Sequence, residues 1–339
     1  MLEPRVGVVA IGRNEGERLR KCLASVAGSA RAIVYVDSAS TDGSAQMARE
    51  MGVEVLGLDM RFPFRPGRAR NEGFRRLREL VPHLAYVQFV DGDCEIVAGW
   101  IGKAAAFLDA HPDVAVVSGR LRERHPERSI YNMLMAVEWD SQPPGESKAC
   151  GGNALMRVDV FSAMHGFHPD LMAGEEPELC IRMRGAGWRI WFLDEQLAWH
   201  DAAMTRFGQW WRRAVRGGYS MAQGASLLAQ GACLHGAAPE EYRATRGSLI
   251  RALLRTWFWA LALPLAAFAL ALGWSWWALL LLLLYPLRLL RARGAGAPRR
   301  NRWHAVFQLL ANFPHILGQL RFLTDRCFRR QPRLIEYKS

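Results

Sequence analysis

Cysteine is scarce in this sequence, and its spacing shows no pairing. The 339 residues contain six cysteines, at positions 22, 94, 150, 180, 233 and 327, without a C-x-x-C pair. This usage favours reduced thiols in packing roles over disulfides, and it argues against a structural zinc site held by thiolates. The start of the chain also lacks a basic stretch followed by a long apolar core, so we expect no secretory signal and a cytoplasmic N-terminal part.

Excess charge is nearly absent outside the C-terminal tail. The net charge is +12, but residues 288–339 hold twelve Arg and Lys against two Asp and Glu, which leaves +2 for residues 1–287. Because the excess of basic over acidic residues lies in one short segment, we expect no nucleic-acid partner.

Charged residues are missing from Thr256–Leu287, a run of 32 residues. About 20 apolar residues are enough for one membrane crossing, so this run is long for one helix and slightly short for two. Helices over Ala252–Leu272 and Trp274–Leu290, joined at Gly273, would keep both basic flanks on the cytoplasmic side. We therefore predict a transmembrane helical hairpin over residues 252–290, with a single crossing as the alternative.

The basic tail, residues 291–339, contains a further helical pattern. Apolar side chains recur at helical spacing, with His, Asn and Gln on another face. The apolar set is Trp303, Val306, Phe307, Leu310, Phe313, Leu317 and Leu320. We predict an amphipathic helix that lies in the membrane interface and kinks at Pro314, with a third crossing as the alternative.

Before residue 200, short β-branched runs alternate with amphipathic stretches. "VGVVAI" precedes "ERLRKCLASV", "AIVYVD" precedes "GSAQMAREM", "VEVLGL" precedes "RARNEGFRRLREL", and "AYVQFV" precedes "GWIGKAAAFLDA". This alternation predicts an α/β fold with a mostly parallel sheet, in which ligands bind at the carboxyl ends of the strands. Polar residues stand at those ends: Arg13-Asn14-Glu15, Asp37-Ser38 and Asp91-Gly92-Asp93.

Two aspartates, Asp91 and Asp93, directly follow the apolar run "YVQFV". Like charges this close need a cation or hydrogen-bond donors to offset them, and Mg²⁺ commonly takes one or two carboxylates together with substrate phosphate oxygens. The structural alternative is a turn in which Asp91 caps the following helix. The nucleophile motif of haloacid-dehalogenase-type phosphatases also begins in this way, but it has Thr or Val where this chain has Glu95.

Further segments accompany the two aspartates in a fixed order. They are "VVAIGRNEGERLRKCLASV", "YVDSASTDGSAQMA", "GRARNEGF", "FVDGDCEI" and "GFHPDLMAGEEPELCIRMRGAGWRIWFL". With them, residues 6 to about 220 resemble the inverting family 2 glycosyltransferases. The resemblance implies a GT-A fold, a nucleotide-diphosphate-sugar donor and a Mg²⁺ or Mn²⁺ cofactor. It also implies a catalytic domain over residues 1–235, which a linker over residues 236–251 joins to the membrane segment.

The resemblance also assigns the donor site. Asp37 would contact the base of the nucleotide, and Glu15, with Arg13 beside it, the base or ribose region. Arg70 would contact base or phosphate, and Asp91 the ribose or the metal shell. These residue types suit the ligand, because a nucleotide diphosphate needs acceptors for its base and ribose and positive charge for its phosphates.

The metal and the catalytic base follow from the same resemblance. Asp93 would bind the metal, with Asp91 beside it and His200 as a third ligand. Attack by a sugar hydroxyl needs a carboxylate that takes up its proton. Glu176 stands where the family usually has an aspartate in this role, so the base is either Glu176 or Glu175. Both would also suit the first turn of a helix.

Two further segments resemble the acceptor side of the family. The residues expected there are Gly151, Gly152, Asn153 and Trp210. Arg212 and Arg213 would close over the diphosphate of the donor. In "GQWWRRAVRGGYS", Arg213 replaces the tryptophan of the Gln-x-x-Arg-Trp motif of processive synthases, so we expect a single transfer instead of polymerisation.

Together these features predict an inverting, metal-dependent glycosyltransferase that uses a UDP- or GDP-linked sugar. The membrane segment favours a polyprenyl-linked lipid or a polysaccharide precursor as acceptor. The expected location is the cytoplasmic face of a bacterial inner membrane. The alternatives are a processive polysaccharide synthase, the phosphatase, and a non-catalytic membrane scaffold.

Overall fold

A computed structural model describes residues 5–230, 239–292, 299–330 and 334–336. The chain forms two compact units. The first, here called the sheet unit, comprises Met1–Arg124, Trp139–Ala202 and Gly231–Tyr242. The second, here called the helical unit, comprises His125–Glu138, Ala203–Gln230 and Arg243–Ser339.

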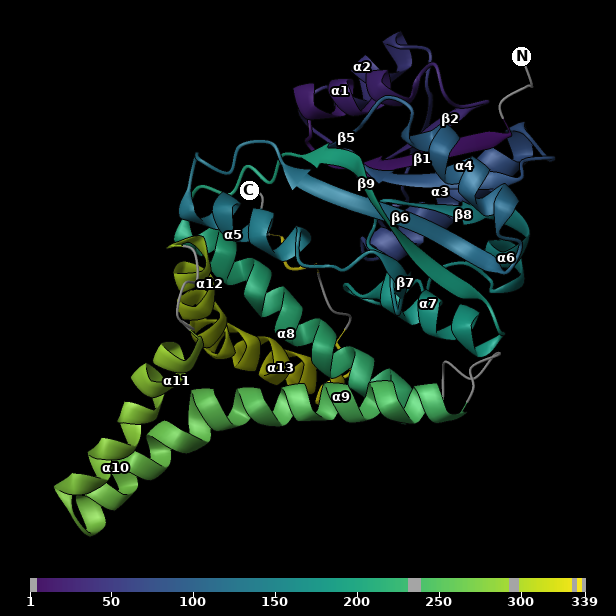
Figure 1. The fold of residues 1–339 in the computed structure, drawn as a ribbon. Helices are drawn as coiled ribbons and strands as arrows, with labels where there is room; N and C mark the ends of the chain where they lie inside the picture. Colours follow the sequence, from purple (N-terminus) through teal and green to yellow (C-terminus); the bar gives the residue numbers. More distant parts are fainter. Residues whose placement is uncertain (1–4, 231–238, 293–298, 331–333, 337–339) are drawn as a thin grey trace. The chain divides into compact units, whose positions relative to one another are not determined.

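The sheet unit is built on nine strands in the order β3-β2-β1-β4-β8-β6-β9-β5, with β7 paired to β9. Their bounds are β1 Val6–Gly12, β2 Ile33–Asp37, β3 Glu54–Gly57, β4 Tyr86–Asp91, β5 Cys94–Ile96, β6 Val114–Glu123, β7 Gly145–Ser147, β8 Ala154–Arg157 and β9 Arg189–His200. Strands β1 to β4 are parallel, and β8 runs antiparallel between β4 and β6 (Figure 1). The predicted mostly parallel α/β fold is confirmed.

The first three helices of the sheet unit connect the parallel strands β1 to β4 as the sequence alternation predicts, the fourth follows β5, and the last two lie between β8 and β9. These helices are α1 Glu17–Val26, α2 Ser44–Glu50, α3 Pro66–Leu80, α4 Trp100–Ala110, α6 Val158–Ala163 and α7 Glu175–Gly185. Helix α1 buries Leu19, Cys22, Leu23 and Val26, which recur at the spacing of one helix face. Hydrophobic burial against the sheet therefore determines where this helix packs.

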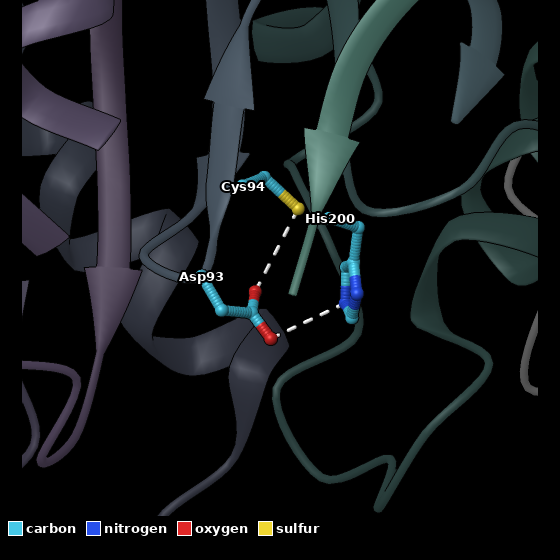
Figure 2. Close-up of side chains that lie close together, drawn as sticks. All are labelled: Asp93, Cys94 and His200. Carbon is cyan, nitrogen blue, oxygen red and sulfur yellow. Dashed lines mark hydrogen bonds and ion pairs between the residues drawn. The ribbon is translucent and has the colours of Figure 1, made fainter. Parts of the chain in front are cut away.

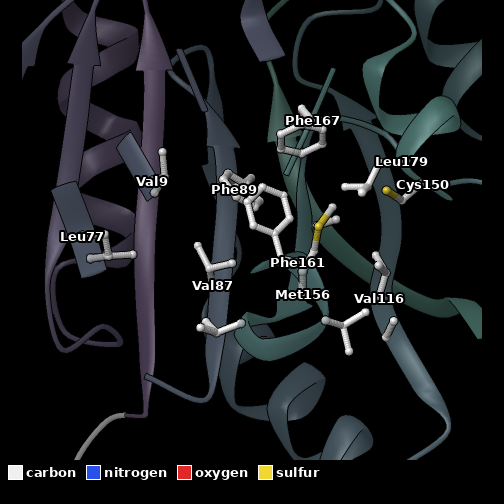
Figure 3. Close-up of a cluster of buried hydrophobic side chains, with 14 of the residues drawn as sticks. Val9, Leu77, Val87, Phe89, Val116, Cys150, Met156, Phe161, Phe167 and Leu179 are labelled. Atoms are coloured by element: carbon white, nitrogen blue, oxygen red, sulfur yellow. The ribbon is translucent and has the colours of Figure 1, made fainter. Parts of the chain in front are cut away.

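Neighbouring side chains along each central strand point into separate cores on the two faces of the sheet. In β1, Val9 belongs to one core cluster and Val8 to the other. This double burial explains why the central strands read as continuous apolar runs. In the first core, the rings of Phe161 and Phe167 lie 5.1 and 5.2 Å from that of Phe89 (Figure 3).

Strand register brings the polar residues of separate strands to one edge of the sheet. Gly12 at the end of β1 pairs with Asp37 at the end of β2, and Ile11 pairs with Asp91 at the end of β4. The parallel sheet thus collects the polar strand ends as the sequence predicts. Asp91 is not a helix cap, because β5 follows it and α4 begins only at Trp100.

A long helix, most of which lies in the helical unit, runs from Pro239 to Gly273, and its part over Tyr242–Gly273 is a candidate membrane span. This helix is long and apolar enough to cross a membrane, and it is the one such helix within the described ranges. It comprises α9 Pro239–Trp257, a π-helical turn over Phe258–Ala262 and α10 Leu263–Gly273. Residues 239–251 of the expected linker are helical, in keeping with their Ala, Leu and Arg side chains, which are good helix formers, and residues 236–238 lie outside the described residues.

After Gly273 the chain turns back along this helix. The returning segment comprises η2 Trp276–Leu283 and α11 Leu284–Ala292, and Figure 1 shows it beside α10. The Tyr285 hydroxyl donates to the Trp259 carbonyl, and their rings lie 5.4 Å apart. Two apolar helical segments thus pack against each other on either side of Gly273. That both cross a membrane stays a prediction.

The rest of the helical unit is formed by α5 Ile130–Trp139, α8 Phe207–Ala229, α12 Arg299–Leu310 and α13 Asn312–Cys327. The helix break lies at Ala311, and Pro314 falls in the first turn of α13, where a proline is tolerated.

Helix α13 buries two polar side chains together with Ile316 and exposes several leucines together with Arg321 and Arg326. Asn312 and Gln319 are buried, whereas Leu317 is 47% exposed and Leu320 and Leu323 are similarly exposed. In water such a helix would turn its leucines inward, so this arrangement suits apolar surroundings.

Two glycines allow α8 and α13 to pack side by side (Figure 1). A Cβ atom at Gly218 would overlap the backbone of His315, and one at Gly318 would overlap the Val215 carbonyl. The helix backbones are therefore in direct contact, which only glycine permits.

We predict that Gly218→Ala destabilises the helical unit by about 1–3 kcal/mol, because the added methyl group meets backbone that has no room to move. Gly224→Ala on the same helix is the matched control. Its Cβ would meet only Leu249 Cδ1, at 3.8 Å, and alanine in a helix interior gains up to about 1 kcal/mol. Thermal unfolding in detergent, followed by circular dichroism, compares the two variants. Equal midpoints would contradict the close crossing.

Candidate functional site

The loops at the carboxyl ends of β1 and β2 are joined by side-chain hydrogen bonds. Asp37 accepts from the Tyr35 hydroxyl at 3.0 Å and from the Ser40 amide at 2.9 Å. Asn14 Oδ1 accepts from the Thr41 amide at 2.7 Å. These bonds hold both loops in one arrangement at the edge of the sheet.

Glu15 follows Asn14 in the first of these loops. Its carboxylate lies 2.8 Å from the guanidinium of Arg18, and the side chain is buried. Arg13, the remaining predicted donor residue of this loop, is partly exposed at the end of β1. Glu15, Asp37 and Arg13 thus belong to neighbouring loops of the sheet edge.

Arg70 on α3 lies among three carboxylates. Its guanidinium is 2.7 Å from Asp91, 2.6 Å from Glu175 and 3.1 Å from Glu176. Burial alone would lower the pKa of Arg70, but the three carboxylates outweigh burial and raise it. The sequence named all four residues, and the structure brings them into a single cluster.

Glu176 is the carboxyl of this cluster with the clearest perturbation. Burial raises its pKa to about 7, and the neighbouring charge of Glu175 adds to the rise, while Arg70 opposes it. Both glutamates lie in the first turn of α7, as expected. A carboxyl that titrates near neutral pH suits a general base.

Gly152 lies against the same cluster. A Cβ atom there would lie 3.0 Å from Asp91 Oδ2 and 3.1 Å from Glu176 Oε1, and it would overlap the guanidinium of Arg70. The backbone at this glycine therefore covers the cluster closely. Its neighbour Gly151 is exposed, and among the described residues a Cβ atom there would have no contact within 4 Å beyond its chain neighbours.

Asn153 supports the end of β4. Its Oδ1 accepts from the backbone amide of Asp91 at 3.0 Å, and its Nδ2 donates to Cys94 Sγ at 3.3 Å. The side chain is buried. Asn153 thereby positions the strand end that carries both aspartates.

Asp93, Cys94 and His200 form a compact group of potential metal ligands (Figure 2). The Asp93 carboxylate lies 3.2 Å from His200 Nε2, and Cys94 Sγ lies 3.6 Å from the other Asp93 oxygen. The group forms because β5 pairs with β9, which places Cys94 directly opposite His200. The structure thus brings together two of the three predicted metal ligands, whereas Asp91 turns toward Arg70.

Glu123 is a neighbour of His200 that the sequence analysis missed. Its carboxylate lies 3.7 Å from His200 Nδ1, and it accepts from the Ala202 amide at 3.2 Å. Glu123 pairs with His200 in the register of β6 and β9. The Trp139 ring lies 4.1 Å from the imidazole. No local motif surrounds Glu123, so only the strand register could have revealed it.

The donor set of this group fits a divalent cation. Asp93 offers the carboxylate oxygen that Mg²⁺ and Mn²⁺ take, and His200 offers an imidazole nitrogen, which Mg²⁺ rarely uses. A carboxylate behind the other ring nitrogen is the usual support of a metal-binding histidine. Cys94 and Asn153 contact each other beside Asp93, so the sulfur has a packing partner there.

The remaining predicted residues lie in the helical unit. Trp210 is buried, with its ring 4.9 Å from that of Phe307. Arg213 donates to both carboxylate oxygens of Glu138, at 2.8 and 3.1 Å. Arg212 is the exposed residue before it on α8. The predicted contacts of these three residues with the donor and the acceptor stay predictions.

Comparison with known proteins identifies the sheet unit. Residues 8–164 match the family described as Glycosyl transferase family 2. Glucomannan 4-beta-mannosyltransferase 2 from Arabidopsis thaliana is 22% identical over 205 residues, which cover 54% of this chain and 38% of that protein. The chain therefore spans well under half the length of this relative.

Two solved structures share the fold. A mannosyltransferase, PcManGT from Pyrobaculum calidifontis, solved in complex with GDP-Man and Mn²⁺, matches with a TM-score of 0.67 and 21% identity over 96% of this chain and 89% of that one. S. aureus TarS matches with a TM-score of 0.52 and 16% identity over 93% and 91% of the two chains.

These likenesses agree with the order of motifs, the sheet topology and the carboxylate-rich strand ends. They leave the phosphatase alternative without support. Residues 8–164 thus match a Glycosyl transferase family 2 domain, and the chain has the GT-A fold.

Proposed function

We propose that the protein transfers one sugar from a nucleotide-diphosphate donor to an acceptor hydroxyl, with inversion at the anomeric carbon. The observation that carries this proposal is Glu176, a largely but not fully buried carboxyl whose pKa is raised to about 7 beside Arg70 and Glu175. At neutral pH a large fraction of it is ionised and able to take a proton. The hydroxyl oxygen bonds to the anomeric carbon, the bond to the diphosphate breaks, and the hydroxyl proton ends on Glu176.

Arg70 has two roles in this proposal. It keeps Glu176 and Asp91 in place, and it adds positive charge near the position of the leaving diphosphate. Glu175 is the more tightly paired glutamate, with its oxygen 2.6 Å from the guanidinium. We therefore assign the base to Glu176 and a positioning role to Glu175.

Asp93 and His200 would hold the divalent cation. When bound, the cation would neutralise the charge of the donor phosphates. We assign Glu123 a positioning role, because its carboxylate lies 3.7 Å from Nδ1 of His200 and would support the ring with Nε2 directed at Asp93. The imidazole favours Mn²⁺ over Mg²⁺.

GDP-mannose is the first donor to test, although UDP-sugars fit the same site chemistry. The support comes from the relatives, one of which is a glucomannan mannosyltransferase and another of which was solved with GDP-Man. The loops that carry Glu15 and Asp37 would bind the nucleotide.

A lipid-linked acceptor is supported by the helical unit. The chain contains a helix able to cross a membrane, a basic tail and a helix that exposes leucines. We therefore propose that the enzyme works at the cytoplasmic face of a bacterial inner membrane on a polyprenyl-linked or glycan acceptor.

The assignment of the base predicts a loss of turnover in Glu176→Gln. We expect a decrease of a hundredfold or more in kcat/KM, which corresponds to about 2.7 kcal/mol of transition-state stabilisation. The wild-type kcat/KM should fall as pH drops below about 7, since the base is then protonated. Release of nucleoside diphosphate at several pH values measures both effects.

Glu175→Gln is the matched control, and it should still lose activity at low pH, but at a lower pH than wild type because the charge of Glu175 no longer raises the pKa of Glu176. The folded chain holds the Glu176 proton more tightly than the unfolded chain, so wild-type stability should decline between pH 4.5 and about 7. Glu176→Gln should lack that decline. The opposite pattern for the two variants would make Glu175 the base.

The role of Glu123 predicts weaker metal binding without it. We expect Glu123→Ala to bind Mn²⁺ 10–100-fold more weakly than wild type, because His200 is then free to rotate. Calorimetry with Mn²⁺ alone, without donor, measures the affinity. Glu95→Ala is the control, since Glu95 pairs with Arg124 at 2.6 Å instead of His200. Equal affinities in both variants would reject the role of Glu123.

The full proposal is tested with the full-length protein in membranes. Purified enzyme with Mn²⁺ should consume one donor of a panel of GDP- and UDP-sugars when extracted lipid acceptor is present, and the product should carry one added sugar. Products with many added sugars would indicate a processive synthase. Donor binding without turnover would indicate a scaffold, and efficient transfer to water-soluble acceptors alone would contradict the lipid-linked acceptor.

A further inference from the structure

The helical unit contains a cavity between α8, α9 and α13. Its volume is about 460 Å³, within the range of small-molecule sites. Most of its lining is apolar. The lining residues are Ala222, Ser226, Ala229, Gln230, Leu253, Trp257, Gln319, Phe322, Leu323 and Arg326.

Gln319 is the buried polar side chain of this cavity. It is 2% exposed, and among the described residues neither its Oε1 nor its Nε2 has a hydrogen-bond partner. A buried amide left in this state costs about 1–3 kcal/mol for each unpaired group. Such a group in a cavity wall points to a ligand that supplies the missing partner.

A positively charged side chain, that of Arg326, lines the same cavity. Arg326 is exposed, and its guanidinium donates to the Ser226 hydroxyl. Arg329 and Arg330 follow it along the chain. A ligand held here would therefore carry a negative group as well as an apolar part.

The surroundings of the cavity are apolar. Leu254, beside the lining residue Leu253, is 64% exposed, and Leu320 and Leu323 are exposed on α13. Helix α9 continues from Trp257 into the apolar segment that ends at Gly273. Exposed leucines on both helices are expected where lipid chains replace water.

We propose that this cavity binds an anionic glycerophospholipid. One acyl chain would pack against Leu253, Trp257 and Phe322, an ester oxygen would accept from Gln319 Nε2, and the phosphate would pair with Arg326. The lipid site takes no part in the transfer reaction, so a test of lipid binding does not depend on the proposed function.

Native mass spectrometry of the delipidated full-length protein in detergent tests the site. Phosphatidylglycerol and phosphatidylcholine with the same acyl chains are the two probes. We expect one phosphatidylglycerol per chain, bound about tenfold more tightly than phosphatidylcholine. Gln319→Leu and Arg326→Ala should each weaken phosphatidylglycerol binding about tenfold, and Ala222→Phe should abolish it by filling the cavity. Arg321→Ala is the matched control, because Arg321 is exposed on α13 outside the cavity lining.

If the wild type and all variants bind phosphatidylglycerol equally tightly, the proposal is overturned, because the lipid then adsorbs to the protein surface and occupies no specific site. Equal affinity for the two lipids would overturn its anionic part. If Ala222→Phe fails to fold, Gln319→Leu decides. If the Gln319→Leu protein unfolds at a higher temperature and binds phosphatidylglycerol as tightly as wild type, the Gln319 amide does not contact the lipid.

Discussion

The buried guanidinium of Arg70 is the interaction on which the candidate site depends. Removing a charge from water costs several kcal/mol, and only partners in good geometry repay this cost. Here three carboxylates, Asp91, Glu175 and Glu176, surround one cation. The three carboxylates outnumber the single guanidinium, so keeping all three ionised costs free energy. Burial of Glu176, reinforced by the charge of Glu175 and opposed by Arg70, keeps its pKa near 7, which suits the proton acceptor of the proposed transfer.

Strand pairing supplies the second half of the site. The register of β9 against β5 and β6 places His200 between Asp93 and Glu123. Asn153 ties this group to the end of β4 through the Asp91 amide. The carboxylates of the Arg70 cluster and the proposed metal ligands thus share one rigid framework, in which Asp91 and Asp93 are two residues apart. A site on strand ends held in this way costs little reorganisation during reaction.

The helical unit differs from the sheet unit in which side chains it buries and which it exposes. The sheet unit buries aliphatic and aromatic side chains on both faces of its strands. Helix α13 instead buries Asn312 and Gln319 and exposes leucines. Both arrangements minimise free energy if the first unit meets water and the second meets lipid. The glycine contacts at Gly218 and Gly318 fit the same view, since close backbone packing replaces the hydrophobic effect where lipid is the solvent.

The sequence alone determined the β–α alternation, the polar strand ends, the order of the motifs and the apolar helix, because each depends on residues close together along the chain. It also named Glu176, Arg70, Asp93 and His200. Only the tertiary structure decided that Arg70 lies among three carboxylates, that Glu123 supports His200, and which face of α13 is buried. Those facts depend on strand register and helix packing between segments many residues apart. A local pattern cannot encode them, since the same pattern is compatible with more than one partner.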